Sequence, residues 1–243
     1  MVFYKKSDLG FFFCTIDNYM GFHYSSHSRV KRKRGMKMKL LVTGFEPFGG
    51  ESINPAFLAV SMLPDRINNA VILKKEIPTA FYESRRVLSE YMRAEQPDLV
   101  FCIGQAGGRA GITVEKVAIN LAEAGIPDNN GNQPENEPIV EDGNTAYFTN
   151  LPIKAMVKQI QEAGIPASIS YTAGTYVCNY IFYSLMYEIE QNYPSARGGF
   201  IHVPYATNQG VGKSANTPTM EVATIARGIE IAILSAIETK NDI

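Results

Sequence analysis

The chain has 243 residues, of which 45% are apolar and 19% charged, and its formal net charge is -1. This length and composition predict one globular domain with a full core and exclude disordered and collagen-like proteins. No apolar run approaches the roughly 20 residues that a membrane helix needs, so we expect a soluble protein without membrane contact. Three cysteines without CxxC spacing favour a reducing cytoplasm over a disulfide framework.

Residues 1–35 differ in composition from the rest of the chain. They hold an aromatic cluster followed by the basic run RVKRKRG. The apolar piece GFFFC is too short for a signal peptide, and the basic run follows it instead of preceding it. We expect residues 1–35 to be an N-terminal extension, disordered or outside the native protein, ahead of a functional domain at 36–243. A basic tail that binds acidic partners is the alternative. The remaining, acidic body predicts no nucleic-acid binding.

Strand and helix patterns alternate from residue 39 onward. KLLVTGF predicts a buried strand, and INPAFLAVSML predicts a helix with Asn54 as its N-cap and Pro55 in its first turn. AVILKKEI predicts a second strand, and residues 79–95 have the period of an amphipathic helix. PDLVFCIG is continuously apolar, as buried parallel strands are.

The same alternation continues after the glycine-rich turn GQAGGRAG. ITVEKVAIN predicts a strand, and residues 125–150 predict a long ordered loop because Pro, Asn and Gly are frequent there. Four further segments follow: a helix at PIKAMVKQIQEA, a strand at ASISYTA, a helix over 177–191 and a strand at GGFIHVPY. A closing helix is expected over 218–238. Strands that alternate with helices predict an α/β sandwich with a mainly parallel sheet.

Two cysteines of this body have different surroundings. Cys102 lies within a predicted buried strand, where a cysteine acts as a small apolar residue. Cys178 lies in the first turn of the helix over 177–191, directly after AGTYV. Backbone N–H groups at a helix start lower the pKa of a thiol, and the thiolate is the reactive form. Cys178 is therefore either a nucleophile or a buried helix residue.

His202 is the one histidine beyond residue 35, and it ends a predicted strand. Open α/β sheets bind their ligands at such strand ends, and histidine acts as a base toward a thiol and as an acid toward a leaving amine. Glu115 lies among apolar residues of another predicted strand. It either orients the imidazole, as the third member of a catalytic triad does, or is exposed on an edge strand.

Six ordered blocks, TGFEPFGG, GQAGGR, ITVEKVAIN, IPDNNGNQP, AGTYVCN and GGFIHVPY, resemble the pyroglutamyl peptidase I family, also called pyrrolidone-carboxylate peptidases. The likeness runs from about Lys39 to the last helix. It implies a cysteine peptidase that removes N-terminal pyroglutamate from peptides without a metal or a cofactor. It also implies a cytoplasmic, three-layer α/β/α protein that is commonly a homotetramer.

The resemblance assigns roles to individual residues. It implies Cys178 as nucleophile, His202 as general acid and base, and Glu115 as the carboxylate that orients the histidine. It implies a substrate pocket formed by Phe45, Phe48, Gln105, Ile126, Tyr176 and Val177. Three positions depart from the family: Gly125 stands where arginine is common, Tyr176 where phenylalanine is common, and Tyr180 where histidine is common. With glycine at position 125, a cation near the oxyanion is either missing or supplied by another residue, for which Arg109 is the candidate.

Two other functions are compatible with these patterns. A nucleoside phosphorylase-like transferase has a related sandwich, and its phosphate would bind at the glycine-rich turns, although neither turn has the GxGxxG or GxxxxGK[ST] spacing. The second alternative is a protein that binds pyroglutamyl peptides but turns them over poorly, because Gly125 lacks the charge of the arginine that is common there in the family.

Overall fold

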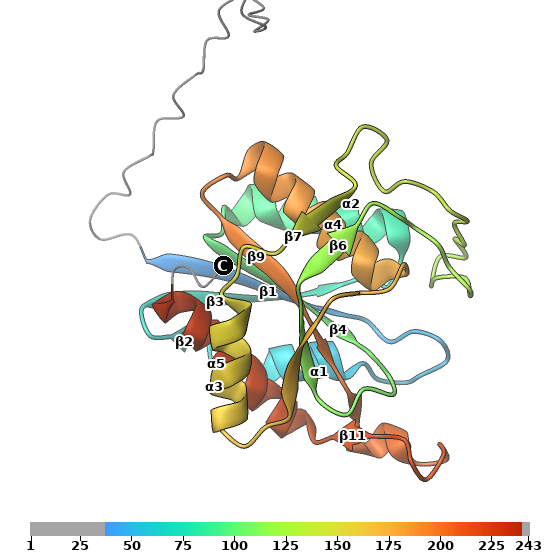
Figure 1. Ribbon diagram of the computed structural model, residues 1–243, viewed down its shortest axis with the longest axis vertical. Coiled ribbons are helices and arrows are strands. Elements are labelled where there is room, and N and C mark those ends of the chain that lie inside the picture. The colour runs from blue at the N-terminus through green and yellow to red at the C-terminus, as the bar shows by residue number, and fades with distance from the viewer. Residues whose placement is uncertain (1–36, 240–243) are drawn as a thin grey trace, which may run out of the picture. The chain divides into compact units, whose positions relative to one another are not determined.

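A seven-stranded sheet forms the centre of the computed structural model, which describes residues 37–239 (Figure 1). The strands in spatial order are β2 (Arg66–Ile67), β3 (Ala70–Ile77), β1 (Met38–Phe45), β4 (Leu99–Gln105), β9 (Arg197–Val203), β5 (Ile112–Glu115) and β8 (Ala167–Ser170). All neighbours are parallel except β2 with β3 and β5 with β9. The prediction of a mainly parallel sheet is confirmed.

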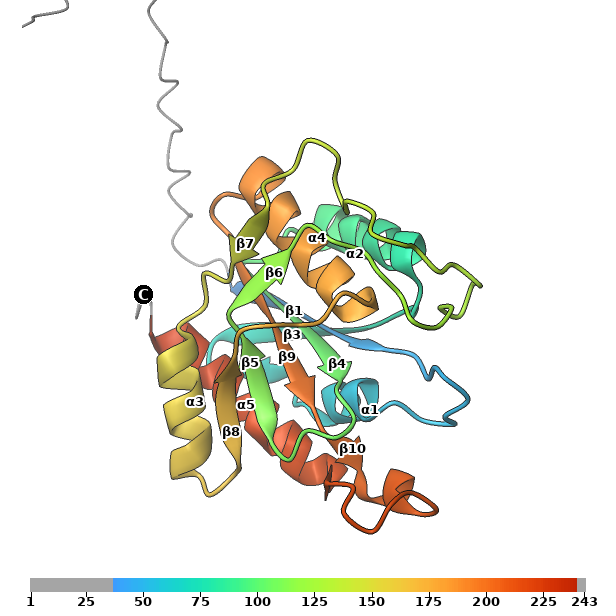
Figure 2. The ribbon, with the colours of Figure 1, turned by 45° about the vertical axis from the view of Figure 1, so that its right-hand side comes forward.

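Five α-helices cover the two faces of this sheet (Figure 2). They are α1 (Pro55–Met62), α2 (Phe81–Glu95), α3 (Ile153–Glu162), α4 (Val177–Asn192) and α5 (Val222–Glu238). Apolar residues of α1, α3 and α5 share one buried cluster with the sheet, and those of α2 and α4 share the other. The three-layer α/β/α architecture is therefore confirmed.

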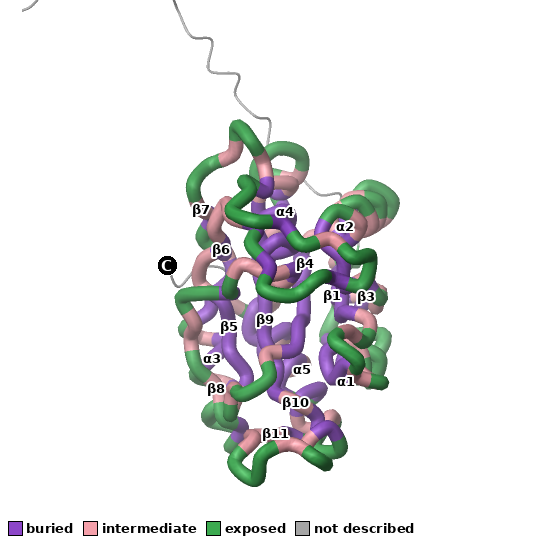
Figure 3. Tube along the Cα trace, turned by 90° about the vertical axis from the view of Figure 1, so that its right-hand side faces the viewer, coloured by how far each residue is buried: buried purple, intermediate pink, exposed green. Residues whose placement is uncertain are grey.

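The central strands are buried on both faces, as Figure 3 shows for β1, β4 and β9. Successive side chains of a strand point to opposite faces, so Phe101 packs toward α1, α3 and α5, whereas Cys102 packs toward α2 and α4. Each large apolar side chain that is fully buried in this way stabilises the fold by about 1.5–3 kcal/mol. This double burial explains why PDLVFCIG lacks polar alternation.

A local signal sets the start of α1, whereas a distant residue sets the start of α2. The Asn54 side chain accepts a hydrogen bond from the N–H of Ala56 (3.0 Å), and Pro55 opens α1, as predicted. Helix α2 begins at Phe81, two residues later than predicted, because its first N–H donates to Asp128 Oδ2 (2.8 Å) on a distant loop. A carboxylate from another segment therefore caps this helix.

Two predicted elements have different bounds in the structure. ITVEKVAIN is not one strand: β5 ends at Glu115, and β6 (Val117–Ile119) pairs separately with β7 (Ala146–Phe148) inside the predicted loop. The closing helix starts at Val222 instead of residue 218, because β11 (Thr219–Met220) pairs with β10 (Tyr205–Ala206). Strand β5 lies between β9 and β8, so the alternative that exposed Glu115 on a sheet edge is wrong.

Within residues 37–239, no helix combines the length and the apolar character needed to span a membrane. The predicted extension at residues 1–35 lies outside the described part of the chain.

Candidate active site

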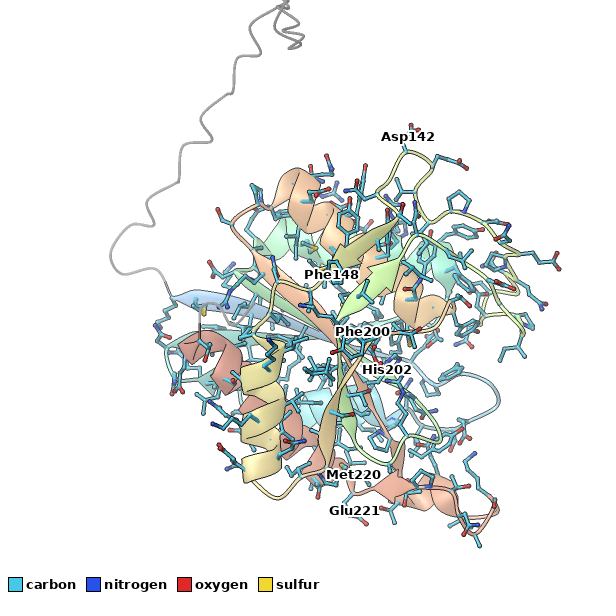
Figure 4. All side chains as sticks on the ribbon, viewed as in Figure 1. Asp142, Phe148, Phe200, His202, Met220 and Glu221 are labelled. Carbon is cyan, nitrogen blue, oxygen red and sulfur yellow. The ribbon has the colours of Figure 1, made fainter. Side chains whose placement is uncertain are left out.

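Three neighbouring strands bring a row of residues to one face of the sheet. Gly104 on β4 pairs with His202 on β9, and His202 pairs with Thr113 on β5. Paired residues in a sheet present their side chains on the same face, and Phe200, two residues before His202, packs on the α4 side. Figure 4 labels Phe200 and His202 side by side on β9, and their ring centroids are 4.8 Å apart. The row therefore faces α4.

His202 and Glu115 form a buried pair in this row. The imidazole Nδ1 lies 2.7 Å from Glu115 Oε1, and the two residues are 4% and 0% exposed. Burial alone raises the pKa of Glu115, but hydrogen bonds from His202 and Arg109 outweigh it and hold that pKa below its ordinary value. Burial also lowers the pKa of His202, against the opposing effect of Glu115. The pair therefore consists of a carboxylate and a neutral imidazole near neutral pH.

Cys178 occupies the first turn of α4 and lies directly above Gly104. A Cβ atom at position 104 would lie 2.9 Å from Cys178 Sγ and 2.6 Å from the Phe200 ring. Glycine at this position therefore makes room for the sulfur beside the strand that carries His202. The thiol belongs to the same electrostatic cluster, since the charges of Glu115 and Arg109 both act on it.

The acidified thiol that we expected at this helix start is not found. Burial, reinforced by the negative charge of Glu115, raises the pKa of Cys178 above its ordinary value, and the positive charge of Arg109 offsets only part of this effect. The thiol is therefore neutral when the site is at rest. A thiolate must be generated by proton transfer to a nearby base, and the neutral imidazole of His202 is suited to accept that proton.

The first turn of α4 also supplies free hydrogen-bond donors. Its first intrahelical bond runs from Tyr180 N–H to Tyr176 O (3.1 Å), and no side chain caps the helix start. The N–H groups of Val177, Cys178 and Asn179 precede that bond and have no partner within the helix. Donors of this kind can stabilise an oxyanion that develops next to the sulfur.

Asn179 anchors this turn to the rest of the fold. Its Oδ1 accepts from Ile119 N–H (3.0 Å), and its Nδ2 donates to Ile119 O (2.9 Å) and Leu121 O (3.0 Å). The side chain is almost fully buried. These bonds fix the residue next to Cys178 against β6 and the loop that follows it.

A cluster of aromatic rings lies beside the start of α4. The Tyr176 ring lies 6.3 Å from Phe48 and 5.2 Å, edge to face, from Phe81. The Tyr176 hydroxyl donates to Pro127 O (3.1 Å), and Asn129 Nδ2 donates to Pro47 O (2.9 Å). The loops after β1 and after residue 125 are thereby joined beside α4, next to the cluster of aromatic rings.

The other predicted pocket residues occupy varied positions. Phe45 is buried at the end of β1, with its ring 6.4 Å from Phe200, and Val177 is fully buried at the start of α4. Gln105 ends β4, and its Oε1 accepts from Gln209 Nε2 (3.0 Å). Ile126 is 52% exposed and lies next to Pro127, the acceptor of the Tyr176 hydroxyl. Tyr180 packs edge to face on Phe81 (5.4 Å) in the core.

Sequence reasoning missed several residues that organise the site. Thr113 and Ser170 lie beside Glu115. Thr113 is on the same face of β5 as Glu115, and Ser170 on β8 pairs with Glu115, so both could be identified only once the strand order is known. Gly104 had a usable signal, because a glycine inside a buried strand marks a close approach. Within residues 37–239, no three His, Cys, Asp or Glu side chains come together as a metal site requires.

Sequence comparisons match this chain to one family of peptidases. The family model described as pyroglutamyl peptidase matches residues 38–239. The pyrrolidone-carboxylate peptidase of Clostridium botulinum is 54% identical over 206 residues, which are 85% of this chain and 96% of that protein. The corresponding protein of Enterococcus faecalis is 55% identical, with the same coverage.

Solved structures of similar proteins have the same fold. Pyroglutamyl peptidase I from Bacillus amyloliquefaciens superposes with a TM-score of 0.83 at 49% identity, over 86% of this chain and 99% of that one. A mutant pyrrolidone carboxyl peptidase from Pyrococcus furiosus gives a TM-score of 0.79 at 40% identity, over 83% and 99%. Fold, sequence and the family model coincide over the whole described region, and the chain belongs to the pyroglutamyl peptidase family.

Proposed function

We propose that this chain removes an N-terminal pyroglutamyl residue from peptides, with Cys178 as nucleophile, His202 as general acid and base, and Glu115 as the residue that orients the imidazole. One observation carries the proposal: Cys178 lies at a helix start, directly above Gly104, beside the buried pair of His202 and Glu115. A nucleophile, a base and an orienting carboxylate are the parts that acyl transfer requires.

Acylation begins with transfer of the thiol proton from Cys178 to His202. The sulfur attacks the carbonyl carbon of the pyroglutamyl residue, and the carbonyl oxygen becomes an oxyanion near the N–H groups of the first turn of α4. Each well-placed donor is worth roughly 3 kcal/mol in the transition state. Collapse of this intermediate breaks the C–N bond, and His202 returns its proton to the departing amine.

Deacylation reverses these roles with water. His202 accepts a proton from the water that attacks the thioester carbon, the C–S bond breaks, and the proton returns to the sulfur as pyroglutamate leaves. Glu115 stays ionised throughout and keeps Nδ1–H of the imidazole as a donor, so that Nε2 exchanges the proton. No cofactor enters this sequence of steps.

The cluster of aromatic rings beside α4 suits the substrate. Pyroglutamate is a neutral lactam without a free α-amine, so its ring faces call for aromatic contact and its amide edge for a few hydrogen bonds. We propose that Phe48, Tyr176 and Ile126 contact the ring, with Phe45 and Val177 beneath them. The backbone of Gln105, at the end of β4, is the proposed partner of the lactam.

The substrate class is tested with chromogenic amides of pyroglutamate, proline and glutamate at equal concentration. The proposal predicts cleavage of the pyroglutamyl amide alone, at a rate independent of added phosphate. Equal cleavage of the prolyl amide, or a strict need for phosphate, would contradict it. Resistance of the activity to iodoacetamide would likewise favour the phosphorylase-like alternative.

Binding without turnover is a separate alternative, because Gly125 has open space around it at a position where the family resemblance implies an arginine. Calorimetric affinity for a pyroglutamyl amide, set beside its hydrolysis rate, separates the two. Fast turnover eliminates the binding-only function, and micromolar affinity without measurable hydrolysis establishes it.

We propose residues 36–243 as the catalytic domain, with support from the family match over 38–239. A cytoplasmic location agrees with the two free cysteines of the described region. A homotetramer agrees with exposed Phe148 (64%) and Tyr171 (72%), the first of which Figure 4 labels on β7. Light scattering at micromolar concentration tests the tetramer, and a monomeric mass would contradict it.

A further inference from the structure

Arg109 lies in the glycine-rich turn after β4, and its guanidinium contacts two other segments of the site. Nη1 donates to Glu115 Oε1 (2.6 Å) and to Thr113 Oγ1, both on β5. Nη2 donates to Thr172 O (3.1 Å), in the segment that leads from β8 to Cys178. One planar group therefore connects the orienting carboxylate with the chain that carries the nucleophile.

The shared acceptor constrains the chemistry of the histidine. Glu115 Oε1 receives Nη1 of Arg109 at 2.6 Å and Nδ1 of His202 at 2.7 Å, and the two nitrogens are 3.5 Å apart. A guanidinium only donates, so the carboxylate has to be the acceptor for both. The proton of a neutral His202 must then reside on Nδ1, which leaves Nε2 free to act as the base.

The carboxylate depends on these contacts for its position. Glu115 is fully buried, and its second oxygen, Oε2, has no hydrogen-bond partner in the structure. Three bonds to Oε1 therefore hold the group: short ones from the histidine that it orients (2.7 Å) and from Arg109 (2.6 Å), and a long one from Thr113 Oγ1 (3.5 Å). Arg109 is 29% exposed, so its own charge remains partly solvated while it neutralises a buried carboxylate.

We propose that Arg109 is a positioning residue for the peptidase reaction: it holds Glu115 in the orientation that sets the His202 tautomer and ties this pair to the segment preceding Cys178. The inference rests on the proposed function. It also replaces the expectation that Arg109 assists the oxyanion, because the guanidinium is bound to Glu115 and Thr172. Arginine suits the task because its fixed fork reaches both acceptors at once.

Arg109 also acts through its charge. The groups that face His202 are Glu115 and Arg109, and those that face Cys178 are Glu115, Arg109, Cys102 and Tyr176. The positive charge of Arg109 favours the thiolate and disfavours the imidazolium, so it lowers the pKa of both Cys178 and His202. Removal of that charge should move both pKa values upward.

The test compares Arg109→Met, Arg109→Lys and the control Arg85→Met in assays on a pyroglutamyl amide across pH. Arg85 also donates to a loop carbonyl, Ile139 O (3.2 Å), but it is a half-buried residue of α2 and has no carboxylate partner among residues 37–239. We expect R109M to lower kcat about 10- to 100-fold with little change in KM. Both limbs of its pH profile should move to higher pH. R109K should keep the limbs in place while its kcat falls, and R85M should match wild type.

Three outcomes would overturn the inference: kcat of R109M within twofold of wild type, unchanged limbs in R109M, or R109K equal to wild type in every parameter. If R109M does not fold, as judged by circular dichroism, the R109K comparison decides. Failure of the proposed function is distinguishable, because wild type itself would then leave the amide intact. In that case the pH dependence of iodoacetamide alkylation at Cys178 replaces the assay: a higher midpoint in R109M supports the positioning role, and an equal midpoint refutes it.

Discussion

His202 Nδ1 and Glu115 Oε1 lie 2.7 Å apart, and neither side chain has appreciable contact with solvent. The bond joins β9 to β5, two strands that are antiparallel neighbours although 87 positions separate the residues in the chain. A carboxylate buried this deeply would be costly without such a partner. The pair therefore contributes both to the folded state and to the proposed chemistry.

Substitution of Glu115 by Gln keeps the shape of the side chain but removes the charge. We expect kcat to fall by roughly 10²- to 10⁴-fold, because the amide can present its NH₂ to Nδ1 and stabilise the wrong tautomer. The bond to Glu115 raises the pKa of His202, so its loss should shift the acidic limb of the kcat/KM profile to lower pH. Glu162→Gln, on the exposed face of α3, is the control and should leave both unchanged. An E115Q variant with a wild-type profile would contradict the assigned role.

The same pair predicts how stability depends on pH. Burial lowers the pKa of folded His202, so below about pH 6.5 the unfolded chain gains a proton that the folded chain does not. The free energy of unfolding should then fall by up to about 1.4 kcal/mol per pH unit. Glu115, whose folded pKa is lowered, adds stability that is lost as the pH falls below about 4.5. Urea unfolding from pH 8 to 3 measures both declines. His202→Gln should flatten the first decline, and an equal slope in that variant would argue against the assignment.

Gly104→Ala tests whether the absence of a side chain at position 104 is needed to accommodate the sulfur of Cys178. The new methyl would collide with Cys178 Sγ (2.9 Å) and with the rigid Phe200 ring (2.6 Å), so the sulfur must move. We expect kcat/KM to fall about 10²-fold. Gly198→Ala is the matched control on β9, since its methyl meets the flexible tips of Ile189 (2.7 Å) and Leu185 (3.1 Å) and the backbone oxygen of Val100 (3.2 Å), all away from Cys178. It should cost about 1–3 kcal/mol of stability but leave kcat/KM within twofold. Equal kinetic losses in both variants would mean that general destabilisation causes the effect.

Asn179→Ala removes the side chain that fixes the residue after the nucleophile. It leaves the N–H and C=O groups of Ile119, and Leu121 O, without their side-chain partners, so we expect the free energy of unfolding to drop by about 2–4 kcal/mol. Asn192→Ala, at the exposed end of the same helix, loses a single bond to Glu188 and should cost less than about 0.5 kcal/mol. Denaturant melts of the two variants with similar midpoints would contradict the anchoring role.

Local sequence signals predicted most of the fold because burial and capping act over short spans. Continuous apolar runs identified β1 and β4, and the Asn54–Pro55 start identified α1. The split of ITVEKVAIN could not be predicted. Lys116 N–H donates to Ser170 O (2.7 Å), whereas its carbonyl accepts from Thr149 N–H (3.0 Å), so the chain changes sheets through bonds to distant residues.

The candidate site also combines features that the local sequence predicts with features that depend on distant residues. Cys178 was identifiable from the helix start, and His202 from the strand end, since both features are local. Their surroundings depend on strand order. Burial of Glu115 follows from the position of β5 inside the sheet, and the raised pKa of Cys178 follows from burial and from the nearby carboxylate. Helix position alone therefore suggested an acidic thiol, and tertiary packing reverses that expectation.

The nucleophile assignment is tested most directly by Cys178→Ser, assayed beside wild type on a pyroglutamyl-linked chromogenic amide with the prolyl amide as control, over a range of pH. The account predicts that wild type cleaves only the pyroglutamyl substrate and that C178S, with an unchanged melting temperature, does not cleave it. If C178S were as active as wild type, Cys178 would be a packing residue and another group would have to carry the reaction.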